Sequence, residues 1–146
     1  MRHELLITDR IPPAFTDQRG DITNIISEPL RHVAIISSVA GSVRGHHYHI
    51  EGGQYIYVIR GRLVSVSIPV PTDPSYNAER HGYLIEFSSF EAGEGALLYC
   101  PPMVAHAYRF LEDTVFLNLD TAIRRLADGT DDTRPYTVIH PLLEAR

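Results

Sequence analysis

The sequence predicts an all-β protein, a sandwich or barrel of short strands. Runs rich in Ile, Val and Tyr recur along the chain, turn residues separate them, and apolar side chains alternate within them at the period of two that strands have. We expect strands at residues 22–27, 32–38, 54–60, 62–68, 83–87, 96–99, 106–110 and 114–119.

The expected strands differ in how they are buried. Residues 54–60 are apolar on both faces, with Gln54, Ile56 and Val58 on one of them, which is typical of a strand between a cavity and a second layer. Residues 62–68 alternate valine or isoleucine with serine, a half-buried pattern. Gly61 predicts a tight hairpin turn between these two strands.

Two further segments follow from their turn residues. Residues 72–82 are polar and carry the breakers Pro74 and Gly82 after Pro71, so we expect a loop that joins the two halves of the fold. Residues 122–127 predict a short helix near the C-terminus, with Thr121 as its N-cap and Gly129 near its end.

Composition limits the function classes. A chain of 146 residues fits a single domain, 1–146, and a net charge of −5 argues against a nucleic-acid partner. No apolar run approaches the ~20 residues of a membrane span and no signal peptide is visible, so we expect a cytoplasmic protein. The single cysteine, Cys100, is expected to be a small buried apolar residue. All basic residues are arginine, which excludes Schiff-base chemistry on lysine and a P-loop.

The histidines carry the chemical signal. His47 and His49 are two residues apart on an expected strand, so their imidazoles project from one face and can chelate one cation. A third ligand must come from another strand, and His106 is the best candidate because it follows a proline turn and opens a new strand. Tyr108 and Phe110 share its face, and we expect them to line a substrate cavity with Ile56 and Val58.

Two spaced motifs give a family resemblance. Gly41, His47, His49, Gln54 and Gly61 follow the spacing of the first cupin motif, in residues 41–61, with glutamine at the usual glutamate position. Gly95, Pro101 and His106 follow the second, in residues 95–110, with Met103 where glycine is usual and Phe110 where asparagine is usual. The chain therefore resembles the cupin superfamily, and the resemblance implies a jelly-roll barrel.

The resemblance also implies a metal site. Carried over residue by residue, the ligands are His47, His49, Gln54 and His106, which suit zinc best, with nickel, iron, copper or manganese as alternatives. The neutral Gln54 amide is a weaker donor than a carboxylate, so it should weaken metal retention and strengthen Lewis acidity. The same histidines could also be cavity residues without metal, and Glu51 could replace Gln54, although it sits in a turn and is expected to face water.

The remaining histidines show no ligand pattern. Strand parity turns His46 away from the site, which favours a structural or surface role. Solvated or capping roles are expected for the others, which are His3, His32, His81 and His140.

A narrower resemblance suggests a substrate. Residues 15–21 read FTDQRGD and residues 43–49 read VRGHHYH, which is similar to the 3,5-epimerases and 3,4-ketoisomerases of dTDP-sugars and, most closely, to the cupin domain of the capsular polysaccharide epimerase. This resemblance implies an isomerase or epimerase in which His47 removes a proton beside the ketone of a nucleotide-linked 4-keto-sugar. Arg44 would contact the anion or enolate, whereas parity turns Tyr48 outward. Ile50 departs from the ketoisomerases, which have lysine there.

Other functions stay open. With no lysine, the diphosphate must be bound by arginines, drawn from Arg19, Arg44, Arg60, Arg62 and Arg109. The apolar cavity would also suit a metal-dependent polyketide cyclase or a dioxygenase, and a non-enzymatic sensor of a small ligand is a third class. A homodimer through edge strands or the N-terminal segment is expected, with a small molecule as substrate and no membrane partner.

Overall fold

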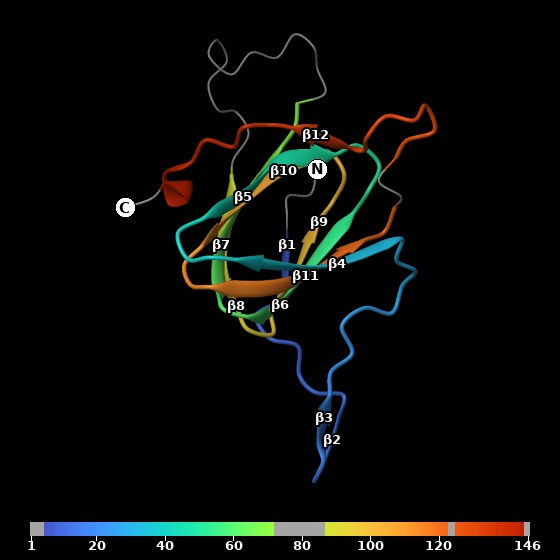
Figure 1. Ribbon diagram of the computed structural model, residues 1–146, viewed down its shortest axis with the longest axis vertical. Coiled ribbons are helices and arrows are strands. Elements are labelled where there is room, and N and C mark those ends of the chain that lie inside the picture. The colour runs from blue at the N-terminus through green and yellow to red at the C-terminus, as the bar shows by residue number, and fades with distance from the viewer. Residues whose placement is uncertain (1–4, 72–86, 123–124, 145–146) are drawn as a thin grey trace.

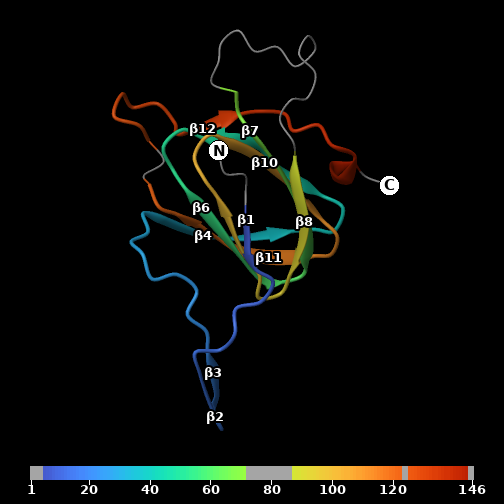
Figure 2. The same ribbon diagram turned by 180° about the vertical axis from the view of Figure 1, so that it is seen from behind.

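Two five-stranded antiparallel sheets pack face to face as a jelly roll in the computed structural model (Figures 1 and 2), which describes residues 5–71, 87–122 and 125–144. The first sheet has the order β1-β9-β6-β11-β4 and the second the order β12-β5-β10-β7-β8. A two-stranded hairpin, β2-β3, stands apart from both. The elements are β1 (Leu5–Thr8), β2 (Phe15–Asp17), β3 (Gly20–Ile22), β4 (His32–Ser38), β5 (Val43–His49), β6 (Gln54–Arg60), β7 (Arg62–Pro69), β8 (Ser88–Gly93), β9 (Leu97–Cys100), β10 (Val104–Phe110), β11 (Thr114–Asp120), β12 (Thr133–Pro135) and the 3-10 turn η1 (Pro141–Leu143).

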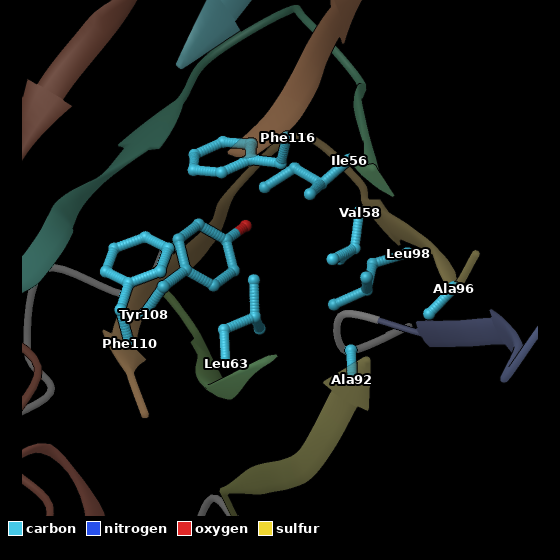
Figure 3. Packing of buried hydrophobic residues seen from close by; sticks show 9 residues of the cluster. All are labelled: Ile56, Val58, Leu63, Ala92, Ala96, Leu98, Tyr108, Phe110 and Phe116. Carbon is cyan, nitrogen blue, oxygen red and sulfur yellow. The ribbon is translucent and has the colours of Figure 1, made fainter. Parts of the chain in front are cut away.

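One end of the barrel interior is filled with apolar side chains. They point toward one another from both sheets (Figure 3), because directly paired residues of antiparallel strands share a face. Phe110 stacks on Phe116 across the two sheets, with ring centroids 5.7 Å apart. The cluster consists of Ile56, Val58, Leu63, Ala92, Ala96, Leu98, Tyr108, Phe110 and Phe116.

A second apolar cluster covers the outer face of the second sheet. The alternating strand β7 turns Ser65 and Ser67 into the barrel, opposite Tyr108 and His106 of β10. Val64, Val66 and Ile68 therefore face outward, where the C-terminal segment buries them under Val138 and Leu143. The alternating sequence of this strand predicts one buried face, but in the structure both faces of β7 are buried.

The β2-β3 hairpin projects away from the barrel in both views (Figures 1 and 2). Phe15 and Ile22 on it are 52% and 57% exposed. Strand β4 is the edge of the first sheet, and Val33 and Ile35 on its outer face are 56% and 70% exposed. The chain therefore exposes apolar side chains on both segments.

Most expected strands are confirmed, and the exceptions are two strands, one loop and one helix. The strand expected at 22–27 is wrong, because pairing ends at Ile22, the last residue of β3. Of the strand expected at 83–87, residues 83–86 lie outside the described residues, as does the expected loop at 72–82, and Phe87 precedes β8.

The expected C-terminal helix at 122–127 is also wrong. Residues 123–124 lie outside the described residues, Arg125 forms a β-bridge with Asp131, and residues 127–129 form a turn. The amide of Leu126 donates to the carbonyl of Thr130, so a tight loop holds the backbone in place of a helix. The C-terminal segment ends in a single 3-10 turn, capped by His140, whose Nδ1 accepts the Leu142 amide. None of the helical residues that the structure describes form a segment long and apolar enough to cross a membrane.

Candidate active site

Three histidines converge inside the barrel. His47 and His49 lie on β5, and His106 on β10 is directly paired with His47. Their candidate ligand nitrogens all lie within 4.8 Å of one another. The His47 ring meets the other two edge-on, with centroids 4.6 Å from His106 and 5.2 Å from His49. The structure thus brings together three of the four ligands predicted from the sequence.

A β-bulge shapes the strand that carries two of these histidines. The register of β5 against β10 shifts between His47 and Gly45, so that His46 is an extra residue. Gly45 and His46 have φ of 97° and 55°. A Cβ at Gly45 would lie 2.7 Å from the carbonyl oxygen of His106, so only glycine fits there. His46 turns outward, where its Nδ1 accepts the amide of Val138 at 3.0 Å.

Residues of the C-terminal segment hold His49. The Nδ1 atom of His49 lies 3.2 Å from Oγ1 of Thr133 and 3.9 Å from Oδ2 of Asp132. The buried Asp132 carboxylate also accepts the amides of residues 50, 51 and 52, which fixes the turn after β5. Because these contacts occupy Nδ1, they leave Nε2 as the nitrogen available to the other two histidines. Glu51 itself is exposed in this turn.

His106 is fully buried and held from behind. Its Nδ1 lies 3.0 Å from the Cys100 sulfur and 3.4 Å from the Val104 carbonyl oxygen. A carbonyl only accepts, so a proton on Nδ1 satisfies this contact and leaves a lone pair on Nε2. Burial and the neighbouring His47 and His49 hold the pKa of His106 well below its usual value, so the ring is neutral.

Gln54 enters the site from the first sheet. Its Nε2 donates to Oδ1 of Asn118 and, at 3.4 Å, to Oδ1 of Asp120. Asn118 Nδ2 donates to Oδ2 of Asp120 at 3.1 Å, and His32 Nδ1 contacts the same oxygen at 2.9 Å. The Oε1 atom of Gln54 is buried and has no hydrogen-bond partner among the described residues.

A cavity of about 190 Å³ gives access to this cluster. Arg44 lies at the cavity, where its Nε donates to Oγ of Ser38 at 2.7 Å and its Nη2 to the carbonyl of Ser37 at 3.1 Å. The lining residues are Ile36, Arg44, Gly45, His47, Gln54, Ile56, His106, Tyr108, Phe116 and Asn118. The site therefore combines imidazoles, one guanidinium, two amides and one phenol with apolar walls.

Other predicted residues fall elsewhere. Phe110 and Val58 lie in the apolar cluster and not among the cavity-lining residues that the structure describes, whereas Ile56 and Tyr108 belong to both groups. Tyr48 faces outward and packs on the second cluster with Tyr136.

The five arginines that were candidates for binding a diphosphate do not gather at one place. Arg19 is paired with Asp17 on the hairpin, and Arg62 with Glu91 on exposed strand surface. Arg60 is exposed, and Arg109 lies outside the cavity lining. Among the described residues of this group of five, Arg44 is the one that lines the cavity.

Several supporting residues were missed by sequence reasoning. Asn118 and Asp120 lie at alternate positions of a strand that was predicted only from its apolar residues, and two polar residues on the inner face could have signalled a buried network. His32 and Asp132 are brought to the site by pairing over 88 and 82 residues, which local patterns do not reveal. Cys100 is buried as expected, but it contacts a site histidine.

The donor set fits a divalent transition metal. Three imidazoles and an amide oxygen are ligands that zinc and its neighbours accept. His106 Nε2 and Gln54 Oε1 are both buried without a hydrogen-bond partner among the described residues, as ligand atoms would be before an ion binds. The residues that could hold the ion are His47, His49, Gln54 and His106.

Solved structures of other proteins share this fold, although comparisons of the sequence find no relative. No family model matches the chain, and neither does any curated protein. Among solved structures, the dTDP-4-dehydrorhamnose 3,5-epimerase of Sulfolobus tokodaii is similar at 23% identity and a TM-score of 0.66, over 87% of this chain and 76% of that one.

Two further solved structures have a similar fold. A mutant of the 3,4-ketoisomerase QdtA from Thermoanaerobacterium thermosaccharolyticum, in complex with TDP-4-keto-6-deoxyglucose, has 20% identity and a TM-score of 0.63, over 92% of this chain and 88% of that one. The rmlC epimerase of Mycobacterium tuberculosis has 17% identity and a TM-score of 0.66, over 96% and 70% of the two chains. The chain thus has the jelly-roll fold of RmlC-like cupins.

Proposed function

We propose that the protein is an isomerase or epimerase that moves a proton next to the ketone of a nucleotide-linked 4-keto-sugar. The observation that carries the proposal is that His47 and Arg44 line one cavity, with a neutral His106 beside His47. The fold neighbours include nucleotide-sugar epimerases and ketoisomerases, which supports this substrate class.

His47 is the base in this proposal. It is half-buried at the cavity, and histidine is the side chain that most often serves as a general base in enzymes. A ring nitrogen takes the proton from the carbon beside the ketone, the C–H electron pair becomes a C=C bond, and the carbonyl pair moves to oxygen. Because His106 is neutral, the imidazolium that forms at His47 meets no fixed positive charge on that ring.

The enolate then collapses in one of two ways. Return of a proton to the same carbon from the opposite face gives the epimer. Return to the former carbonyl carbon, with transfer of the neighbouring hydroxyl proton to the enolate oxygen, moves the ketone by one position. Neither outcome consumes an oxidant or a second substrate. The ketone shift can return the proton held by His47, whereas epimerisation takes its proton from water on the opposite face and leaves the first proton on His47 to be lost to solvent.

Arg44 supplies the positive charge. Its contacts with Ser37 and Ser38 use Nε and one terminal nitrogen, so the other terminal nitrogen can donate to an anion. The anion is the enolate oxygen or the diphosphate, both of which guanidinium binds well.

A metal-centred reaction is the second candidate, favoured by the three histidine nitrogens within 4.8 Å and the acceptor oxygen of Gln54. A bound zinc, nickel, iron or manganese ion would act as a Lewis acid on a substrate oxygen. His47, His49, Gln54 and His106 would hold it. A histidine that gives its lone pair to an ion cannot also be the base, so metal content separates the two candidates.

We also propose a homodimer that covers the exposed hairpin and the edge strand β4. A two-stranded hairpin alone is only marginally stable in water, and an apolar edge strand invites pairing. Sedimentation of the wild type should give a dimer, and I35E, at a position 70% exposed, should give monomers, whereas V39E, at a turn position 69% exposed, should not. A monomeric wild type contradicts this proposal.

Ligand binding tests the substrate class. TDP and UDP at millimolar concentration should raise the melting temperature, since binding stabilises the folded state. TDP-4-keto-6-deoxyglucose should then be converted to an epimer or to the 3-keto isomer. A melting temperature unchanged by either nucleotide contradicts the proposed substrate.

A further inference from the structure

A row of polar side chains crosses the inner face of the first sheet. His32 on β4, Asp120 on β11 and Gln54 on β6 occupy directly paired positions, and Cys100 on β9 is the next partner in the row. Directly paired residues point to the same face, so the row runs from the solvent-reachable His32 to the cavity. Asn118, two residues before Asp120, lies beside it.

The hydrogen bonds of this row have one consistent direction. Asp120 is a carboxylate that accepts from Gln54, Asn118 and His32. Since Asn118 uses its nitrogen toward Asp120, its oxygen is left to accept from Gln54. Both N–H groups of Gln54 are thereby engaged within the row, and Oε1 is its one polar atom without a partner among the described residues.

We propose that Asp120, through Asn118, fixes the Gln54 amide with its oxygen toward the cavity, where it accepts a hydrogen bond from a hydroxyl group of the substrate. A reversed amide would set its oxygen against the acceptor oxygens of Asn118 and Asp120. That arrangement is unfavourable for buried groups. The substrate part of this proposal rests on the proposed function, whereas the orientation of the amide does not.

The fixed amide gives the cavity two unlike kinds of polar group. Gln54 Oε1 and His106 Nε2 are buried acceptors without partners among the described residues, whereas Arg44 is a donor. A substrate hydroxyl is therefore expected at Gln54, and carbonyl or phosphate oxygens are expected at Arg44. Asp120, Asn118 and His32 are positioning residues in this account, because they act through Gln54.

The variant D120N tests the direction of the row. An asparagine at 120 can donate to the Asn118 oxygen, and the Asn118 nitrogen can then donate to Gln54 Oε1. This reversed chain turns a Gln54 N–H toward the cavity and replaces the acceptor by a donor. The number of hydrogen bonds is similar, so the fold is retained while the ligand preference changes.

Binding affinities show whether the orientation of the Gln54 amide affects recognition of the sugar. The ratio of the dissociation constants of TDP and TDP-4-keto-6-deoxyglucose isolates the contribution of the sugar. We expect D120N and Q54L each to lower this contribution by roughly three- to tenfold, and the double variant to lower it no further. The exposed D128N is the matched control and should leave it unchanged. An unchanged ratio in D120N or in Q54L overturns the proposal.

Nuclear magnetic resonance tests the amide without a substrate. The chain has two glutamines, Gln54 and the exposed Gln18, so the side-chain amides are readily assigned with Q54L. The Gln54 amide protons should exchange with solvent far more slowly than those of Gln18, and D120N should shift their resonances and speed their exchange. Exchange of Gln54 at the rate of Gln18 overturns the fixed amide. A wild type that binds neither nucleotide contradicts the proposed function, and this exchange measurement then still decides the orientation.

Discussion

Arg44 and His47 line the same cavity although they lie three positions apart on strand β5. Strict alternation would put them on opposite faces, but the extra residue His46 resets the register, so that Arg44 pairs with the inward-facing Tyr108 and His47 with His106. The bulge therefore places a cation and a base at one cavity. This relationship makes Gly45, at the start of the bulge, a critical position.

Gly45→Ala should destabilise the protein strongly. The added Cβ would lie 2.7 Å from the His106 oxygen and 2.9 Å from the Ala107 Cα, both backbone atoms. We expect a loss of about 3 kcal/mol or more in urea denaturation. Gly41→Ala is the control, because Gly41 also has a positive φ of 84° but meets nothing within 4 Å, and it should cost only about 1–2 kcal/mol. Equal losses of stability in the two variants would contradict the claim that the backbone of β10 leaves no room for a Cβ at position 45.

Arg44→Gln should weaken TDP binding. A charge-assisted hydrogen bond contributes about 1.5–3 kcal/mol, which corresponds to roughly 10- to 150-fold in the dissociation constant measured by calorimetry. Arg62→Gln removes an equal charge from an exposed arginine paired with Glu91 and should have little effect. A smaller effect for Arg44 than for Arg62 would remove Arg44 from the site.

Stability should fall in mild acid because of His106. Burial lowers the pKa of His106, so the folded state binds its proton only well below the usual value of 6.5, whereas the unfolded chain binds it near that value. The contribution of the neutral His106 ring to the free energy of unfolding is thus fully present above pH ~6.5. It decreases as the pH falls below that value, by up to ~1.4 kcal/mol per pH unit. Urea denaturation at pH 7.5 and 5 should show a smaller decrease in His106→Gln than in the wild type. The same decrease in both proteins would contradict a neutral buried His106.

Metal content separates the two candidate functions. If the four predicted ligands hold an ion, elemental analysis of the purified wild type should find about one zinc or other transition metal per chain, and His106→Ala should lose it. A wild type without metal leaves the base mechanism of His47. Equal metal content in the wild type and His106→Ala would break the assignment of ligands.

Much of the fold follows from the sequence. Strands such as β4 and β6 were predicted at their observed bounds, because apolar alternation is a local property that the barrel preserves. Residues 122–127 were predicted to be helical from a capping pattern, but that pattern occurs here in a loop closed by the contact of Leu126 with Thr130. Capping residues also favour turns, and a run of six residues is too short for its apolar spacing to decide between a helix and a turn.

The candidate site was predicted only in part, for a physical reason. His47, His49 and His106 could be proposed from their spacing and a family resemblance, and the barrel brings them together. Asp120 and Asp132 are held by contacts between residues far apart in the chain, and the bulge at His46 depends on two unusual backbone conformations. The partners of these residues and the bulge leave no local pattern in one sequence, although the alternation of Asn118 and Asp120 signals that both lie on the inner face.

Hydrogen exchange at the carbon beside the substrate ketone tests the role of His47 most directly. In D₂O, the wild type should incorporate deuterium from solvent into TDP-4-keto-6-deoxyglucose next to the carbonyl, and His47→Asn should slow this by roughly 10²- to 10⁴-fold. His140→Asn keeps the cap of the 3-10 turn and should exchange at the wild-type rate. Exchange at equal rates in the wild type and His47→Asn, or its absence from both, would contradict proton abstraction by His47.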